Sequence, residues 1–148
     1  MKNRIAGGAA AIFAGALIAA GPWSLFKICS QAHHAHEGHS VCFYTARAEI
    51  GVGVIIALLG IAYILVKDRR LRAGLSFAVA GNAVLSLAVV NVLIGMDPDP
   101  MMACRTAAQP ALNVIATLLL AAALINAVWL LTYRGKASGG VYAPSHSA

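Results

Sequence analysis

Charged residues are scarce in this sequence. Its 148 residues include 11 lysines and arginines and 5 aspartates and glutamates, which together make up 11% of the chain. A typical soluble domain has roughly 25%. The apolar residues, at 60%, are too numerous to be buried in the core of so small a soluble protein. The composition therefore excludes an ordinary soluble domain and predicts a membrane protein.

The sequence also lacks the strict alternation of apolar and polar residues that a transmembrane β-barrel requires. It has instead four long apolar runs, each able to cross roughly 30 Å of hydrocarbon as an α-helix. The predicted fold class is an all-α membrane protein, with four transmembrane helices in an antiparallel bundle and both termini in the cytoplasm. The helices are predicted at about residues 5–26, 46–66, 71–94 and 109–133, in one transmembrane domain of residues 1–133.

Positively charged residues gather in three short segments, and such segments normally face the cytoplasm. The loops between helices one and two and between helices three and four then lie on the periplasmic or extracellular side. We predict a multi-pass protein of the bacterial inner membrane, whose basic charge indicates topology and not nucleic-acid binding. Residues 134–148 are expected to form a flexible cytoplasmic tail. The basic residues are Lys2 and Arg4; Lys67, Arg69, Arg70 and Arg72; and Arg134 and Lys136.

The first apolar run could instead be a cleaved secretory signal, because positive residues precede an alanine-rich stretch. The run continues through Trp23 and Phe26, which makes it longer than the usual apolar region of a signal peptide. We therefore expect it to be retained as a helix.

Small and amide residues indicate how the helices associate. Small residues recur at every fourth position, as in Ala11 with Gly15 and Gly74 with Ala78, which lets helix backbones approach closely. Four asparagines within the apolar runs are expected to face other helices and hydrogen-bond there, or alternatively to line a site for a transported substrate. They are Asn82, Asn91, Asn113 and Asn126.

Two segments of the chain show a short internal similarity. CFYTARAEIGV begins at Cys42 and CRTAAQPALNV begins at Cys104, and each introduces an apolar run. A duplication would make the protein two repeated helical hairpins. Shared helix-entry chemistry is the alternative explanation.

Motifs of known enzyme classes are absent. The sequence has no HExxH metal motif, no CxxC pair, no phosphate-binding loop and no cofactor fingerprint. We therefore expect a non-enzymatic protein. A membrane thiol-disulfide oxidoreductase is a second alternative, because Cys29, Cys42 and Cys104 all fall on the predicted exoplasmic side, where disulfides persist.

Five segments carry a resemblance to a known family: GPWSLFKIC (21–29), CFYTARAEIGVG (42–53), KDRRLRAGLS (67–76), LIGM (93–96) and CRTAAQPAL (104–112). They resemble small four-helix membrane proteins of bacteria and archaea that are catalogued as a domain of unknown function. The resemblance covers essentially the whole membrane portion. It implies an accessory role in a larger membrane complex, through association with permeases of the MacB or FtsX type.

The resemblance also implies two exoplasmic cysteine pairs, which correspond to Cys29 with Cys42 and to position 96 with Cys104. This chain has Met96, so the second pair is incomplete. It also has Phe43 where relatives often have histidine. Cys29 and Cys42 themselves enclose a short loop that suits one disulfide, which would stabilise the fold by roughly 3 kcal/mol in the chain-entropy model.

Potential metal ligands are concentrated in the two exoplasmic loops. Imidazoles suit Zn²⁺ or Cu²⁺, and soft sulfur ligands favour Cu(I). An exoplasmic copper- or zinc-binding protein is therefore the first alternative function, and a solvated loop without a physiological metal also remains open. The candidate ligands are His33, His34, His36 and His39 in the first loop, and Met101, Met102 and Cys104 in the second.

Glu49 lies near the start of the second apolar run, where a carboxylate needs a partner. We expect an interface ion pair between Glu49 and Arg47 or Arg105. A proton or ion relay through Glu49 is the alternative.

Overall fold

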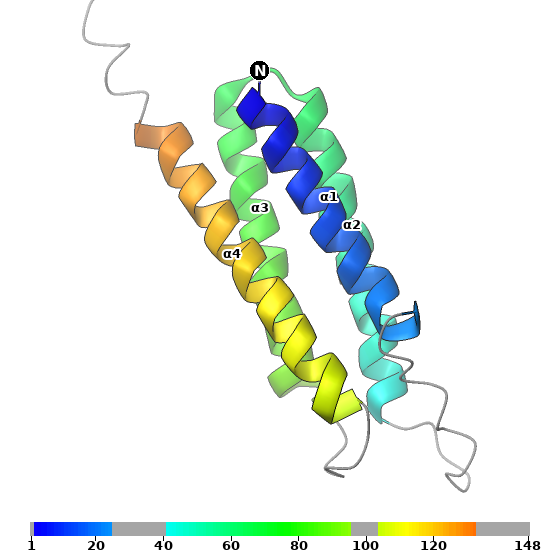
Figure 1. The fold of residues 1–148 in the computed structure, drawn as a ribbon. Coiled ribbons are helices and arrows are strands. Elements are labelled where there is room, and N and C mark those ends of the chain that lie inside the picture. The colour runs from blue at the N-terminus through cyan, green and yellow to red at the C-terminus, as the bar shows by residue number, and fades with distance from the viewer. Residues whose placement is uncertain (1, 25–40, 96–103, 133–148) are drawn as a thin grey trace, which may run out of the picture.

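The computed structural model describes residues 2–24, 41–95 and 104–132. In these residues the chain forms four long helices and no strand (Figure 1). Each helix is long and apolar enough to cross a membrane. The predicted fold class, an all-α bundle of four transmembrane helices, is confirmed. The elements are α1 (Lys2–Ser24), α2 (Val41–Leu65), α3 (Arg69–Ala88), the π-helix η2 (Val89–Leu93), the π-helix η3 (Cys104–Ala108) and α4 (Gln109–Thr132).

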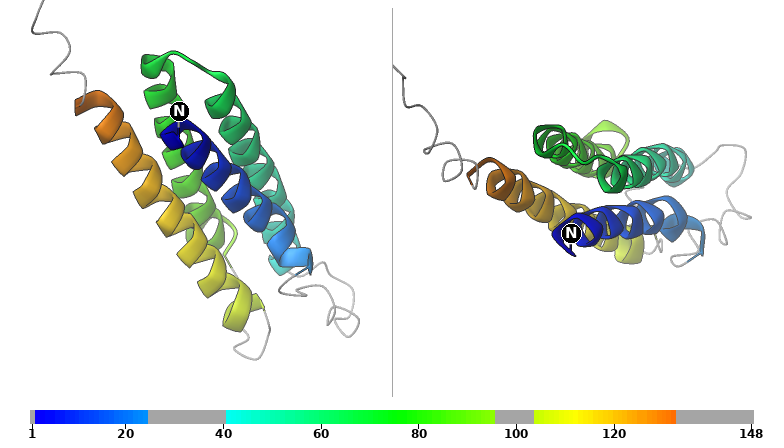
Figure 2. Two further views of the ribbon diagram at one scale, coloured as in Figure 1. Left: turned by 45° about the horizontal axis from the view of Figure 1, so that its top comes forward. Right: turned by 90° about the horizontal axis from the view of Figure 1, so that it is seen from above.

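The four helices run antiparallel in chain order (Figures 1 and 2). The closest pairs are α1 with α2 and α3 with α4, and the two pairs meet mainly through α2 and α3. The start of α1, the α2–α3 turn and the end of α4 lie at one end, which we call the basic end. The start of α2, the end of η2 and the start of η3 lie at the other end, which we call the loop end. The bundle is thus built from two helical hairpins, although duplication of one hairpin stays a prediction.

A three-residue turn, 66–68, joins α2 to α3 at the basic end. Asp68 caps α3, because its Oδ1 accepts a hydrogen bond of 3.0 Å from the backbone N–H of Arg70. A side-chain oxygen in this position satisfies one of the amide groups that a helix start leaves unpaired. So short a turn obliges α2 and α3 to be antiparallel neighbours.

The end of α3 is irregular. The backbone N–H groups of Ile94 and Gly95 both donate to the carbonyl of Val89, at 3.2 and 3.1 Å. Gly95 has a φ of 76°, a conformation that glycine adopts without strain. The Thr45 hydroxyl of α2 donates to the Gly95 carbonyl at 2.7 Å, and this hydrogen bond ties the two hairpins together at the loop end.

Glycines bring α1 and α2 into backbone contact. Gly8 and Gly15 of α1 face Gly60 and Gly53 of α2, so each helix repeats glycine at a spacing of seven. A Cβ atom at Gly53 would lie 2.6 Å from the carbonyl oxygen of Gly15. The prediction that Gly15 packs closely is confirmed. The prediction for Gly74 is wrong, because a Cβ there would meet open space.

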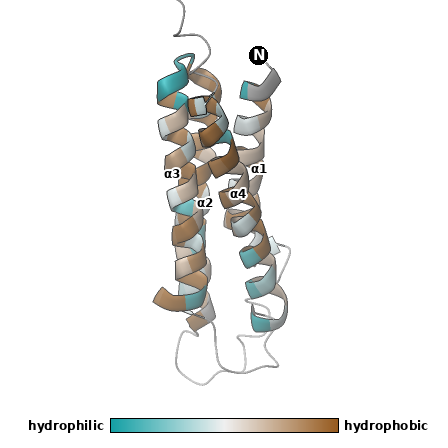
Figure 3. Ribbon diagram, turned by 90° about the vertical axis from the view of Figure 1, so that its left-hand side faces the viewer, coloured by the Kyte–Doolittle hydropathy of each residue, from teal (hydrophilic) through white to brown (hydrophobic). Residues whose placement is uncertain are grey.

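The interior of the bundle is made of small residues as well as large ones. On α4 the buried positions include Ala116, Ala123 and Ala127, whereas Leu118 and Ile125 point outward and are mostly exposed. Figure 3 shows apolar residues along the middle of the helices and hydrophilic residues mostly near the two ends. This distribution suits a bundle whose outer surface contacts lipid.

Candidate functional site

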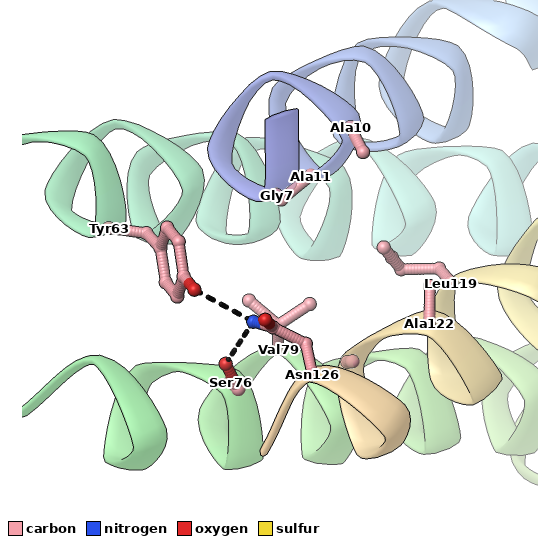
Figure 4. Close-up of a pocket in the computed structure, with 10 residues that line it drawn as sticks. Gly7, Ala10, Ala11, Tyr63, Ser76, Val79, Leu119, Ala122 and Asn126 are labelled. Atoms are coloured by element: carbon pink, nitrogen blue, oxygen red, sulfur yellow. Dashed lines mark hydrogen bonds between the residues drawn. The ribbon is translucent and has the colours of Figure 1, made fainter. Parts of the chain in front are cut away.

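Asn126 lies at the centre of a polar cluster within the bundle (Figure 4). Its Nδ2 donates hydrogen bonds to the Tyr63 hydroxyl of α2, at 2.8 Å, and to the Ser76 hydroxyl of α3, at 2.9 Å. Ser76 in turn donates to the backbone carbonyl of Arg72, at 3.1 Å. One amide of α4 therefore joins three helices.

This cluster forms the polar floor of a space between α1 and α4. The inner part of this space has a volume of about 60 Å³, enough for a few water molecules. It adjoins an open groove of about 500 Å³ that faces the outside of the bundle. The groove exists because α1 and α4 contact each other only sparsely, and because Ala6, Gly7 and Ala122 contribute small side chains to its walls. It is lined by Ala6 and Gly7 of α1 and by Ala122, Ile125, Asn126 and Trp129 of α4.

Glu49 is a second polar group in the bundle, and it is completely buried. Its Oε2 accepts a hydrogen bond of 2.7 Å from the Ser86 hydroxyl of α3. Its Oε1 is buried without a hydrogen-bond partner in the described part of the chain. The two hairpins thus share a carboxyl–hydroxyl contact in their interior. An ionisable group at such a position is a functional candidate by default.

The sequence analysis did not identify Ser86 as the partner of Glu49. The available signal was its place on α3, because Ser86 follows Ala83 on the buried face that also carries Ser76. The Arg47 guanidinium lies 5.0 Å from the centre of the Phe43 ring. An ion pair of Glu49 with Arg47 or Arg105 stays a prediction.

Amide side chains also join the second hairpin near the loop end. Asn91 of η2 and Asn113 of α4 exchange hydrogen bonds of 2.7 and 3.2 Å, and Gln109 donates to Asn91 at 3.2 Å. The expectation that asparagines bond across helices is confirmed for Asn91, Asn113 and Asn126. It is wrong for Asn82, whose amide donates to the Ala78 carbonyl of its own helix.

The predicted disulfide and metal sites lie only partly in the described part of the chain. Cys42 lies in the first turn of α2 and Cys104 is the first residue of η3, so both backbone positions are at the loop end. No group of three or more His, Cys, Asp or Glu side chains gathers within the described ranges. The disulfide and the metal site stay predictions. The following predicted residues lie outside the described part of the chain: Cys29, His33, His34, His36, His39, Met96, Met101 and Met102.

Comparison with known proteins gives one family. The family model described as Domain of unknown function (DUF4418) matches residues 11–129, which includes most of all four helices. No curated protein and no solved structure matches the chain significantly. The resemblance to a family of unknown function is thereby confirmed.

Proposed function

The chain belongs to the DUF4418 family, and we propose that it is a non-enzymatic accessory or assembly subunit of a larger complex in the bacterial inner membrane. The groove between α1 and α4 is the observation that carries this proposal. The proposed occupant of the groove is a transmembrane helix of a larger partner protein.

The lining of the groove supports a helix as the occupant. Ala6, Gly7 and Ala122 present little side-chain volume, so the backbone of a neighbouring helix could approach closely. Dispersion contacts of this kind drive helix association in lipid, where the hydrophobic effect offers no advantage.

Asn126 adds a polar contact to this apolar groove. Asn126 lines the groove, and its side-chain oxygen Oδ1 can accept hydrogen bonds. A serine, threonine or amide on the partner helix could donate to it. Interhelical hydrogen bonds in membranes contribute about 0.6–2 kcal/mol each, so such a side chain on the partner helix would stabilise the complex.

The test is affinity purification of the full chain in mild detergent, followed by mass spectrometry of co-purifying membrane proteins. A permease of the MacB or FtsX type is the partner class that the family resemblance implies. The informative variant is Ala122→Phe, which fills the groove. Its matched control is Ala121→Phe, on the same helix at an exposed residue that does not line the groove.

We expect one membrane protein to co-purify with the natural chain and with Ala121→Phe, and to be lost with Ala122→Phe. Retention of the partner by Ala122→Phe would exclude the groove as the docking site. The absence of any stoichiometric partner would contradict the accessory function itself and would leave a lipid chain as the occupant of the groove.

Copper or zinc binding at the loop end is the second candidate function. It is favoured by the placement of the α2 and η3 starts at the same end, because the His-rich and Met-rich segments both adjoin that end. Elemental analysis of protein purified without a His tag should then show stoichiometric metal. Replacing His33, His34, His36 and His39 with alanine should remove it, and unchanged metal content would reject the site.

A further inference from the structure

The two carboxyl groups in the described part of the chain lie in opposite environments. Asp68 is exposed at the basic end, whereas Glu49 is completely buried between the hairpins. Ser86 donates to Oε2 of Glu49, and Oε1 is buried without a hydrogen-bond partner among the described residues. These residues therefore supply a donor to one oxygen of the buried carboxyl group and none to the other.

Charged and titratable groups in the loop-end half of the bundle lie on its surface. Four such side chains are described in this half, all four are exposed, and α1, α3, η2 and α4 contribute none of them. A carboxylate buried beside one neutral hydroxyl has lost its water without a full replacement, which costs far more than burying the neutral acid. A proton bound to Oε1 of Glu49 removes this cost. The four exposed side chains are Tyr44 and Arg47 of α2, and Cys104 and Arg105 of η3.

The shorter way from Glu49 to water along α2 leads to the loop end. Glu49 lies about 12 Å along the helix axis from Val41, the first residue of α2, and about 24 Å from Leu65, the last. Thr45, one turn nearer the loop end, is also buried, and its hydroxyl donates to the Gly95 carbonyl at 2.7 Å. This hydrogen bond closes the contact of α2 with the end of α3 between Glu49 and the loop end.

The two helices are held together more firmly at the basic end. The three-residue turn 66–68 joins α2 to α3 there. Asn126 links the same two helices near that end, through its hydrogen bonds to Tyr63 and Ser76. Movement of α2 away from α3 is therefore easiest at the loop end, on the side from which Glu49 is nearer to water.

We propose that Glu49 is a proton-binding site in the interior of the bundle, reached from the loop end. A proton from water forms an O–H bond at Oε1, Oε2 remains the carbonyl oxygen that accepts from Ser86, and release returns the proton to water. This exchange requires α2 and α3 to separate at Thr45 and Gly95. The site lies on different residues from the groove of α1 and α4, so it goes beyond the proposed accessory role.

The first test is infrared spectroscopy of the full chain in neutral detergent at neutral pH, where exposed carboxyl groups are ionised. A protonated carboxyl group has a C=O stretching band separate from the bands of carboxylates and amides. We expect this band from the natural chain and its loss in Glu49→Gln. Asp68→Asn is the matched control, because it removes an exposed carboxyl group and should leave the band unchanged.

Two outcomes of this measurement would overturn the proposal. Absence of the band from the natural chain would identify an ionised Glu49, paired with an arginine or a metal cation. Retention of the band in Glu49→Gln would assign the proton to another group.

A second spectroscopic signature does not require replacement of Glu49. Ser86→Ala removes the hydrogen bond to the carbonyl oxygen, so the C=O band should move to higher frequency. Thr132→Ala removes an exposed hydroxyl at the basic end and should leave the band in place. An unshifted band in Ser86→Ala would contradict the site.

Access from the loop end is tested by transfer of the protein into D₂O. Replacement of the acid proton by deuterium lowers the frequency of the band, and the rate of this change reports how often water reaches Glu49. Thr45→Val keeps the shape of the side chain and removes its bond to Gly95, so exchange should be about 10-fold faster, the effect of one ordinary hydrogen bond. Thr117→Val, at an exposed position of α4, should exchange at the natural rate. An unchanged rate in Thr45→Val would overturn the route from the loop end.

Discussion

Glu49 brings a carboxyl group into the interior of the bundle with one hydroxyl as its hydrogen-bond partner among the described residues. Removing that hydroxyl leaves both carboxyl oxygens without a partner from those residues. We predict that Ser86→Ala lowers the free energy of unfolding by about 1–3 kcal/mol, the cost of a buried polar group left unsatisfied. Thermal unfolding in detergent, followed by tryptophan fluorescence, measures the effect.

Ser24→Ala is the control for this prediction. The Ser24 hydroxyl is exposed and donates to the Ala20 carbonyl of its own helix, at 2.8 Å. Its removal should change the stability little. Equal effects of the two substitutions would show that the Ser86–Glu49 contact contributes nothing to stability.

Asn126 and Tyr63 form a contact whose contribution can be separated from those of their other neighbours. A double-mutant cycle with Asn126→Ala and Tyr63→Phe should give a coupling free energy of about 0.6–1.7 kcal/mol, which extends from the average to the maximum measured for hydrogen bonds between membrane helices. Unfolding in detergent at increasing denaturant measures each variant. A cycle of Asn126→Ala with Thr132→Ala should be additive, because Thr132 donates within its own helix. Additivity in the first cycle would show that the Asn126–Tyr63 hydrogen bond contributes nothing to stability.

At the scale of helices, α1 and α2 depend on glycine where their backbones touch. A Cβ at Gly53 would lie 2.6 Å from the Gly15 carbonyl oxygen, which forces the helices apart. We predict that Gly53→Ala destabilises the protein by about 1–3 kcal/mol, as overpacking does elsewhere. Gly51→Ala, two residues away, meets nothing within 4 Å and should be neutral or slightly stabilising. Comparison of their melting temperatures tests this, and a neutral Gly53→Ala would reject the close packing.

The spacing of small residues in the sequence was insufficient to predict which helices pack closely. Small residues at a spacing of four appeared in both α1 and α3, yet Gly15 packs against a helix and Gly74 does not. The contacts of α1 with α2 instead follow glycines seven residues apart. A small residue permits close approach but does not select the partner, because that choice depends on how the neighbouring helices are oriented.

At the scale of the whole molecule, the two ends of the bundle differ in charge. We predict that the basic end faces the cytoplasm, because positively charged segments are retained there. A green fluorescent protein fused after residue 132 should be fluorescent, and alkaline phosphatase fused at the same point should be inactive. The same reporters fused after Gly95 should give the opposite pattern. Active phosphatase at residue 132 would invert the topology.

The amino-acid sequence was sufficient to predict the membrane class, the four helices and the family. These features depend on local quantities: the length of each apolar run, the number of charges and the order of short motifs. A backbone in hydrocarbon must satisfy its own hydrogen bonds, and a single apolar run does so by forming a helix. The composition of such a run is therefore enough to predict its secondary structure.

Only the tertiary structure decided which face of each helix is buried. The helices are apolar on all sides, so hydrophobicity did not distinguish Ala123, which is inside, from Ile125, which contacts the surroundings. Because the sequence did not show which helix faces meet, it did not predict that Glu49 contacts Ser86 or that Asn126 contacts Tyr63 and Ser76. The paired residues are 37 to 63 positions apart in the chain, and they form hydrogen bonds because a polar group left unpaired in an apolar bundle is costly.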